Sequence, residues 1–256
     1  DHGCDIAILW TNLYDFYRKL GFELAGSEVS LVIDRELKLE TNYKIVEGTK
    51  VDPEAIHKLF LSHTVCSLRN LDETRRYMQI PNTRMYTAWD ANGSIKAFAV
   101  EGKGADLDGY IHEWAGSVSA LMSLFDHIRK AQKRNITVIS PRHSINLIQQ
   151  LKAQGIRSHE GFLGMVKILN HNNLFSKLKR YARAMGVGEL VLEKQGDYYY
   201  FGSEDNIFKT DSDVDLIRLI FGPQRPSEIH KFDPSTTKMF EQIFPIDMWI
   251  WGWDSI

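Results

Sequence analysis

The chain is poor in cysteine, in long apolar runs and in excess charge of either sign. Its 256 residues include two cysteines, Cys4 and Cys66, which are too few for a disulfide framework and make a reducing cytoplasm the expected compartment. No stretch approaches about eighteen uninterrupted apolar residues, so we expect no segment that crosses a membrane. The first residues lack the basic and apolar regions of a signal peptide.

Charge and residue spacing exclude further classes. The formal net charge is −2 and 43% of the residues are hydrophobic, as in an ordinary globular protein. Because there is no basic footprint, we expect no nucleic-acid partner. No Cys/His spacing fits a zinc site, and the acids Asp211, Asp213 and Asp215 lack the glycine and the distant glutamate of a calcium loop. We therefore predict no metal site, while a homo-oligomer is left open.

The most informative stretch runs from residue 6 to residue 22. Ile6–Leu9 is an apolar run, and after a polar break the apolar residues recur at helical spacing. Four of them fall on one helix face, namely Leu13, Phe16, Tyr17 and Leu20. Gly21 provides the helix stop and Phe22 begins a second strand. The pattern predicts a strand–helix–strand unit with Tyr17 on its packed side.

This stretch also carries a family resemblance. Leu9-Trp10, six further residues and then Tyr17-Arg-Lys-Leu-Gly-Phe resemble the end of the acyl-transferring domain of the GNAT superfamily of N-acetyltransferases. The likeness is greatest to their multidomain "enhanced intracellular survival" branch. In that family the matching tyrosine, here Tyr17, donates a proton to the departing coenzyme A thiolate, and a phenol titrating near ~10 still carries that proton at neutral pH. The resemblance also makes Asn12 a candidate contact to the coenzyme. The alternative is that Tyr17 only packs the helix against its sheet.

The motif begins almost at the first residue of the chain. At a typical domain size, an acetyltransferase domain needs roughly a hundred residues before it. We therefore expect residues 1–35 to be the C-terminal end of a first GNAT domain whose remainder is missing. Short strands at 22–25 and 29–33 are expected to complete its sheet, and residues 36–42 to form a linker.

Residues 43–170 are predicted to form a second, complete unit. Asp52-Pro53 marks a helix start, and the turn at residues 90–93, Asp-Ala-Asn-Gly, marks a hairpin. The resulting order, β-α-α-β-β-β-α-β-α-β, is similar to that of the GNAT fold, with Gly155 in the role of Gly21. The fold class that we predict is accordingly α+β with a mixed sheet. The alternative is an unrelated α+β domain.

This second copy lacks both features that carry the family's chemistry. GNAT enzymes hold the coenzyme pyrophosphate on backbone N–H groups of a loop (Arg/Gln)-x-x-Gly-x-(Gly/Ala) at a helix N-terminus. The connection at residues 114–118 is too short for that loop, and Leu151 stands at the tyrosine position, four residues before Gly155. We therefore expect a degenerate, structural copy.

Residues 171–256 differ in character. The pattern at residues 213–222, Asp-Val-Asp-Leu-Ile-Arg-Leu-Ile-Phe-Gly, with a later Phe-Pro and an aromatic tail, resembles the sterol-carrier-like domain that ends the same branch. The tail has three tryptophans, Trp249, Trp251 and Trp253, and each can bury on the order of 200 Å², so we expect the tail to be docked. In the resembled branch the terminal carboxylate points into the active site, which makes Ile256 a candidate base. The alternative is that the tail only pins its domain to a neighbour.

The resemblance implies an N-acetyltransferase that moves an acetyl group from acetyl-CoA, as co-substrate, to the primary amine of a small molecule. Tyr17 and Ile256 would be catalytic, and Asn12 would bind the coenzyme. The alternative of a different class is a non-catalytic GNAT-like scaffold or ligand-binding protein, which the missing pyrophosphate loop favours for this chain taken alone.

Overall fold

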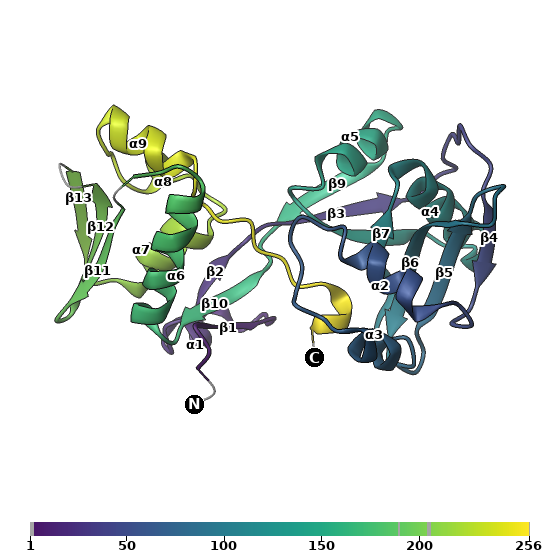
Figure 1. Cartoon of the computed structure of the whole chain (residues 1–256), viewed down its shortest axis with the longest axis horizontal. Helices are drawn as coiled ribbons and strands as arrows, with labels where there is room; N and C mark the ends of the chain where they lie inside the picture. The colour runs from purple at the N-terminus through teal and green to yellow at the C-terminus, as the bar shows by residue number, and fades with distance from the viewer. Residues whose placement is uncertain (1–2, 189, 204–205, 256) are drawn as a thin grey trace. The chain divides into compact units, whose positions relative to one another are not determined.

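The computed structural model describes residues 3–188, 190–203 and 206–255. The chain divides into two compact units, and each is assembled from two separate stretches of sequence (Figure 1). Unit 1 comprises Asp1–Ser27 and Phe162–Met248, whereas unit 2 comprises Glu28–Gly161 and Trp249–Ile256. These units do not follow the boundaries expected from sequence, at residues 35, 42 and 170, and the assignment of domains to those segments stays a prediction.

Unit 2 is built on a seven-stranded sheet of order β4-β5-β6-β7-β8-β3-β9. Its strands are β3 (Glu28–Ile33), β4 (Lys44–Glu47), β5 (Arg84–Trp89), β6 (Ile95–Lys103), β7 (Asp106–Gly116), β8 (Ile136–Pro141) and β9 (Arg157–Gly161). Neighbouring strands are antiparallel except β7 and β8. That parallel pair is in register at Tyr110 with Thr137 and at Ile111 with Val138.

Four α-helices belong to unit 2, and their ends follow local sequence signals. They are α2 (Pro53–Phe60), α3 (Leu71–Tyr77), α4 (Val118–Gln132) and α5 (Ile145–Ala153). Asp52 caps α2 by accepting a hydrogen bond from the Glu54 N–H, and Asn70 and Glu73 form a capping box at α3. Eight of the fifteen residues of α4 are buried, so this helix contributes much of the core of the unit.

The described residues of unit 1 form two three-stranded sheets and five helices. One sheet has the order β1-β10-β2 and the other β11-β12-β13. The strands are β1 (Ile6–Leu9), β2 (Glu23–Ala25), β10 (Gly164–Ile168), β11 (Val191–Gln195), β12 (Tyr198–Ser203) and β13 (Asn206–Thr210). The helices are α1 (Tyr14–Arg18), α6 (His171–Ala184), α7 (Asp213–Phe221), α8 (Pro226–Ile229) and α9 (Pro234–Glu241). Phe201, Phe240 and Phe244 lie together in the core of this unit.

The strand pairing corrects one expectation from the sequence. Residues 29–33 were expected to complete the sheet that β1 begins, but β3 lies between β8 and β9. The strand expected to close the second copy, β10, lies instead between β1 and β2. β3 follows the first strand–helix–strand repeat in the sequence but lies between the two strands of the second repeat. β10 follows the second repeat and lies between the two strands of the first. Alternating apolar residues identify a strand but not its partner, which is why the sequence pattern could not reveal this exchange.

The helix after β1 also differs from its prediction. It spans only Tyr14–Arg18, and three residues of the expected packed face are exposed, with relative exposures of 60% for Leu13, 58% for Phe16 and 47% for Leu20. Periodicity shows which residues share a face, but it does not show what covers that face.

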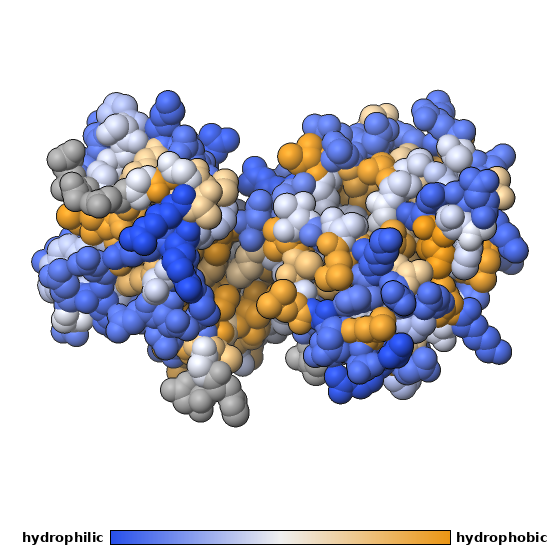
Figure 2. Space-filling model, viewed as in Figure 1, coloured by the Kyte–Doolittle hydropathy of each residue, from blue (hydrophilic) through white to orange (hydrophobic). Residues whose placement is uncertain are grey.

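Within the described residues, no helix combines the length and the apolar character that crossing a bilayer requires. Hydrophilic side chains occupy much of the face of each unit that Figure 2 displays, with smaller apolar areas between them.

Candidate active site

The repeat β1–α1–β2 contains two of the three residues proposed from the sequence, Asn12 and Tyr17. Its helix ends in a Schellman motif, in which the Gly21 N–H donates to the Arg18 carbonyl at 3.0 Å and the Phe22 N–H donates to the Tyr17 carbonyl at 3.1 Å. Gly21 has a φ of +82°, which a glycine adopts without the steric cost that a Cβ brings. The motif therefore fixes the backbone of Tyr17 relative to the start of β2.

The Tyr17 ring is half-buried rather than enclosed. It meets the Phe16 ring edge-on at a centroid distance of 5.1 Å and the Phe22 ring edge-on at 5.7 Å. Within the part of the chain that the structure describes, the Tyr17 hydroxyl makes no hydrogen bond. The two aromatic neighbours restrict the ring while leaving the hydroxyl uncommitted, as a proton donor to a bound ligand requires.

Of the other two proposed residues, the structure describes Asn12 but not Ile256. Asn12 is exposed on the connection between β1 and α1, in the same repeat as Tyr17. Ile256 lies outside the described residues. The structure thus places Asn12 and Tyr17 five residues apart on one repeat, and the role of each of the three residues stays a prediction.

An ion pair next to Tyr17, between the buried Glu23 and the exposed Arg18, was not anticipated from the sequence. Glu23, at the first position of β2, is 3% exposed and forms two hydrogen bonds with Arg18, from Nε and Nη2, each at 3.1 Å. Burial alone would raise the pKa of Glu23, but the bonds from Arg18 and from the Leu24 N–H outweigh it and lower that pKa. This pair ties the end of α1 to β2 and so helps to hold Tyr17. An Arg and a Glu five residues apart give no sequence signal of such a contact.

The second repeat, β8–α5–β9, ends its helix with the same hydrogen bonds. The Gly155 N–H donates to the Lys152 carbonyl at 2.9 Å and the Ile156 N–H donates to the Leu151 carbonyl at 3.1 Å, with a φ of +77° at Gly155. Leu151 consequently occupies the place of Tyr17. Its side chain is fully buried, so this repeat presents an apolar core residue where the first presents a phenol.

The aromatic tail is docked within unit 2, as its composition predicted. Trp251 and Trp253 are fully buried and Trp249 is 6% exposed. Trp251 stacks on His63 with ring centroids 3.9 Å apart and donates its indole N–H to the Val65 carbonyl at 3.1 Å. The described tail is therefore part of the core of unit 2.

A network of buried charges holds the end of this tail. Arg69 pairs with Glu113 at 2.9 Å and with Asp254 at 2.8 Å, and the Arg69 and Glu113 side chains are each 1% exposed. The Trp253 N–H donates to the second oxygen of Glu113 at 3.1 Å, and the Ser67 hydroxyl donates to Asp254 at 2.7 Å. Burial raises the pKa of Glu113 to about 7. Each charged group here has a specific partner, which is the arrangement of a structural anchor.

Two histidines flank the tail in neutral form, because burial lowers the pKa of His63 and of His112 to about 4. His63 donates from Nε2 to the Trp114 carbonyl at 2.8 Å, and the Trp114 indole N–H in turn donates to the Ile139 carbonyl of β8 at 3.0 Å. The His112 ring packs against Gly252, where an added Cβ would lie 1.9 Å from Nδ1. A glycine is therefore required at this position for the tail to pass the ring.

Among the residues that the structure describes, no three His, Cys, Asp or Glu side chains are grouped so as to hold a metal ion.

Comparison with known proteins gives a fold-level result. No family model and no curated protein matches the sequence. The structure is similar to a GCN5-related N-acetyltransferase from Anabaena variabilis ATCC 29413, with a TM-score of 0.59 and 17% identity over 96% of this chain and 72% of that chain. It is also similar to a GCN5-related N-acetyltransferase from Kribbella flavida, with a TM-score of 0.53 and 15% identity over 97% of this chain and 71% of that chain.

A weaker likeness is to Eis1 from Mycobacterium abscessus, with a TM-score of 0.46 and 12% identity over 97% of this chain and 73% of that chain. The chain spans only 47% of the length of a further similar structure.

The two likenesses with TM-scores of 0.59 and 0.53 define the class of fold: the chain has a GNAT-like, mixed α+β fold, which confirms the predicted fold class. At such identities the likeness establishes the fold alone. The membership of the "enhanced intracellular survival" branch and the sterol-carrier-like identity of the C-terminal region stay predictions.

Proposed function

We propose that this chain belongs to an acyl-CoA-dependent N-acetyltransferase that moves an acetyl group from acetyl-CoA to the primary amine of a small molecule. The observation that carries the proposal is the position of Tyr17 in a GNAT-like fold. It stands at the Schellman end of the β1–α1–β2 repeat, with its ring restricted by Phe16 and Phe22 and its hydroxyl uncommitted.

The reaction is a direct transfer. The lone pair of the neutral amine attacks the acetyl carbonyl carbon, whose oxygen is polarised by a backbone N–H of a strand. The C–N bond forms and the C–S bond breaks. Tyr17 gives its proton to the departing thiolate, and the carboxylate of Ile256 takes a proton from the attacking nitrogen. Acetyl-CoA supplies the activated acyl group, and the phenol is reprotonated from solvent.

The described residues fit the thiol end of acetyl-CoA better than its phosphates. Asn12 is exposed and Tyr17 is half-buried on the same repeat, so solvent reaches both side chains. Arg18, by contrast, is engaged by the buried Glu23. We therefore assign Tyr17 and Asn12 to the acyl end of acetyl-CoA, and no residue of this chain to its pyrophosphate.

Substitution of Tyr17 by Phe removes the proton and leaves the ring contacts with Phe16 and Phe22 in place. If Tyr17 is the acid, turnover should fall by ~10²-fold or more while the Michaelis constant for acetyl-CoA changes little. The measurement is release of free coenzyme A thiol, in the protein with its full natural sequence, against a panel of primary amines. The matched control is Tyr14→Phe, since Tyr14 is on the same short helix and 42% exposed. Equal rates for Tyr17→Phe and Tyr14→Phe would rule out the assignment.

The role of Ile256 needs a separate variant, because the tail also carries buried tryptophans. Deletion of Ile256 alone removes the proposed base and retains Trp251, Trp253 and the Asp254 contact with Arg69. Turnover should fall while the thermal midpoint stays unchanged. Unchanged turnover would show that the tail only anchors unit 2.

A non-catalytic, ligand-binding role is the second candidate, and one observation favours it. Leu151 fills the place of Tyr17 in the second repeat and is fully buried, so this repeat offers no phenol at the position that Tyr17 occupies in the first. Isothermal titration with acetyl-CoA separates the two functions, because a scaffold should show no saturable heat while an acetyltransferase should bind the coenzyme.

A further inference from the structure

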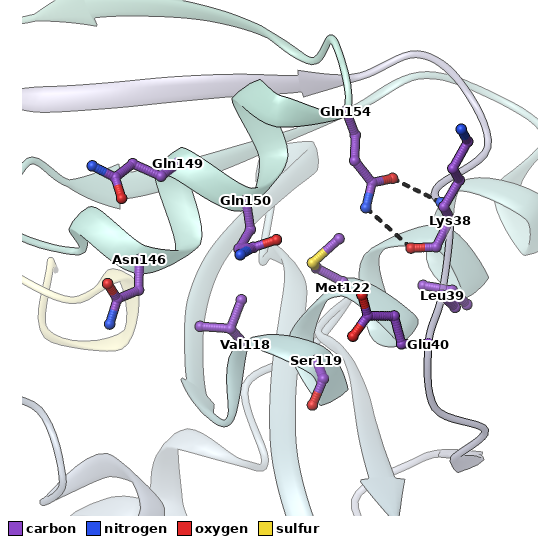
Figure 3. A pocket seen from close by; sticks show the side chains of 10 residues that line it. All are labelled: Lys38, Leu39, Glu40, Val118, Ser119, Met122, Asn146, Gln149, Gln150 and Gln154. Atoms are coloured by element: carbon purple, nitrogen blue, oxygen red, sulfur yellow. Dashed lines mark hydrogen bonds between the residues drawn. The ribbon is translucent and has the colours of Figure 1, made fainter.

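Unit 2 contains a cavity of about 310 Å³ between α4, α5 and the segment that the sequence suggested to be a linker (Figure 3). Its lining residues are Lys38, Leu39, Glu40, Val118, Ser119, Met122, Asn146, Gln149, Gln150 and Gln154. This volume lies at the lower end of the ~300–1,000 Å³ that small-molecule sites occupy. The cavity is therefore large enough for a small ligand.

The wall that faces the two helices is held by specific bonds. The Lys38 N–H donates to Gln154 Oε1 at 2.7 Å, and Gln154 Nε2 donates to the Lys38 carbonyl at 3.0 Å, as the dashed lines in Figure 3 show. One residue earlier, the Leu37 N–H donates to the buried Asp126 carboxylate at 3.1 Å. The Gln154 side chain thus satisfies both the N–H and the carbonyl of Lys38, so this wall is formed before any ligand binds.

The remaining polar lining consists mainly of amides on α5. Asn146, Gln149 and Gln150 are spaced i, i+3 and i+4, so they share one face of the helix. In Figure 3 the amide of Gln150 points from α5 toward Met122 and Val118 on α4. These three amides make no hydrogen bond to any other residue that the structure describes. Each offers both donors and an acceptor without carrying a charge.

The charge of the lining separates two classes of ligand. Lys38 and Glu40 have opposite formal charges, and the other eight lining residues are neutral. A phosphate or carboxylate ligand calls for a surplus of cationic donors, which this lining lacks. Val118, Met122 and Leu39 add an apolar wall. The lining suits an uncharged ligand that has hydroxyl or amide groups on one side and apolar surface on the other.

The first repeat shows that this polarity is particular to α5. Counting back from the glycine of each Schellman motif, Gln150 corresponds to Phe16 and Gln154 to Leu20. α5 buries Leu147, Ile148 and Leu151 on its core side, so the helix is already packed without its amides. The amides are thus available for binding.

We propose that this cavity binds an uncharged small molecule that carries hydroxyl and amide groups, of the class of an N-acetylated monosaccharide. Asn146, Gln149 and Gln150 provide the hydrogen bonds, and Met122 and Val118 contact the apolar face of the ligand. The proposal does not depend on the acetyl transfer assigned to Tyr17, because the cavity and all its lining residues belong to unit 2.

The test is a titration of the full chain with N-acetylglucosamine, followed by amide chemical shifts in NMR spectra. We expect saturable shifts that include the α5 amides, and Gln150→Leu should weaken binding by ~tenfold through loss of its hydrogen bonds. The matched control is Lys152→Leu, also on α5 and exposed but not part of the lining. This control should bind as the parent does, and thermal unfolding checks that both variants fold.

Three results would overturn the proposal. One is the absence of saturable shifts with N-acetylglucosamine. Another is equal affinity in Gln150→Leu and Lys152→Leu, which would place binding elsewhere. The third is tighter binding of N-acetylglucosamine 6-phosphate or of acetyl-CoA at the same residues, which would show a site for anionic ligands. A loss of acetyl transfer in Tyr17→Phe bears on none of these results, so the two proposals fail separately.

Discussion

The repeats β1–α1–β2 and β8–α5–β9 end their helices with the same pair of backbone hydrogen bonds, yet they differ in what their helices bury. Leu13 is 60% exposed, whereas Leu147, at the corresponding position, is 2% exposed. Tyr17 is half-buried and Leu151 is fully buried. α5 packs against α4 within unit 2, and a helix face that is covered in this way must be apolar. The comparison shows that two repeats with the same turn geometry can carry different side chains, Tyr17 and Leu151, at the same position.

The largest expected difference between the repeats is in core packing. Leu151→Ala should lower the free energy of unfolding by about 2–5 kcal/mol, because it leaves a cavity at a fully buried site. Leu13→Ala should change it by less than ~0.5 kcal/mol, since that side chain is already in solvent. Urea unfolding of the two variants measures both values. Similar losses would contradict the exposure of the α1 face.

A second difference concerns pH, because unit 2 holds two neutral buried histidines. The folded-state pKa of His63 and of His112 is about 4, below the ordinary value near 6.5, so the unfolded chain binds more protons between these values. The contribution of the two neutral histidines to the free energy of unfolding is present above about pH 6.5 and is lost as the pH falls toward 4. The raised pKa of Glu113, about 7, acts in the opposite sense, since its contribution is lost as the pH rises through about 7.

With two histidines against one glutamate, these groups together should lower the free energy of unfolding as the pH falls from 7 to 4.5. Tryptophan fluorescence during urea unfolding, between pH 4.5 and 7.5, reports on the tail. Glu113→Gln should steepen the acid dependence, because it removes the opposing group, although the variant also loses an ion pair with Arg69. A profile that is flat or that rises toward acid pH in the parent protein would contradict the expected net loss.

The smallest expected effect is one that the repeats share. Gly21→Ala and Gly155→Ala each place a Cβ on a residue with φ near +80°, and each should cost about 1 kcal/mol. The surroundings tolerate the added atom, since the nearest neighbours are the flexible ends of Lys167 at 3.7 Å and Arg35 at 3.3 Å. Thermal unfolding compares the two. Unequal costs would show that tertiary contacts, and not the turn itself, require glycine at one of them.

Local features of the fold could be predicted from the sequence. The helix stops at Gly21 and Gly155, the cap at Asp52 and the burial of the tryptophan tail all follow from residue chemistry within a few positions. β13 and α8 were not predicted. α9 begins at Pro234, where Asp233 accepts hydrogen bonds from two following N–H groups.

The candidate sites were predictable only in part. Tyr17 and Asn12 could be proposed from the sequence because they stand in a contiguous motif, and their roles stay predictions. The Arg18–Glu23 ion pair could not, because it depends on how α1 meets β2. The cavity of unit 2 was missed altogether. Its wall at Lys38 was predicted to be a linker, and the bonds to Gln154 that fix it join residues 116 positions apart.

The sequence by itself determined the helix stops at Gly21 and Gly155, the cap at Asp52, and an order of short segments that resembles the GNAT fold, because these depend on backbone conformation and on residues a few positions apart. Only the tertiary structure decided that β3 and β10 occupy each other's expected places, that the α1 face is exposed, and that a cavity lies beside α5. The physical reason is that strand pairing and burial depend on contacts between residues far apart in the sequence. A periodic pattern shows which residues share a face but not what packs against that face.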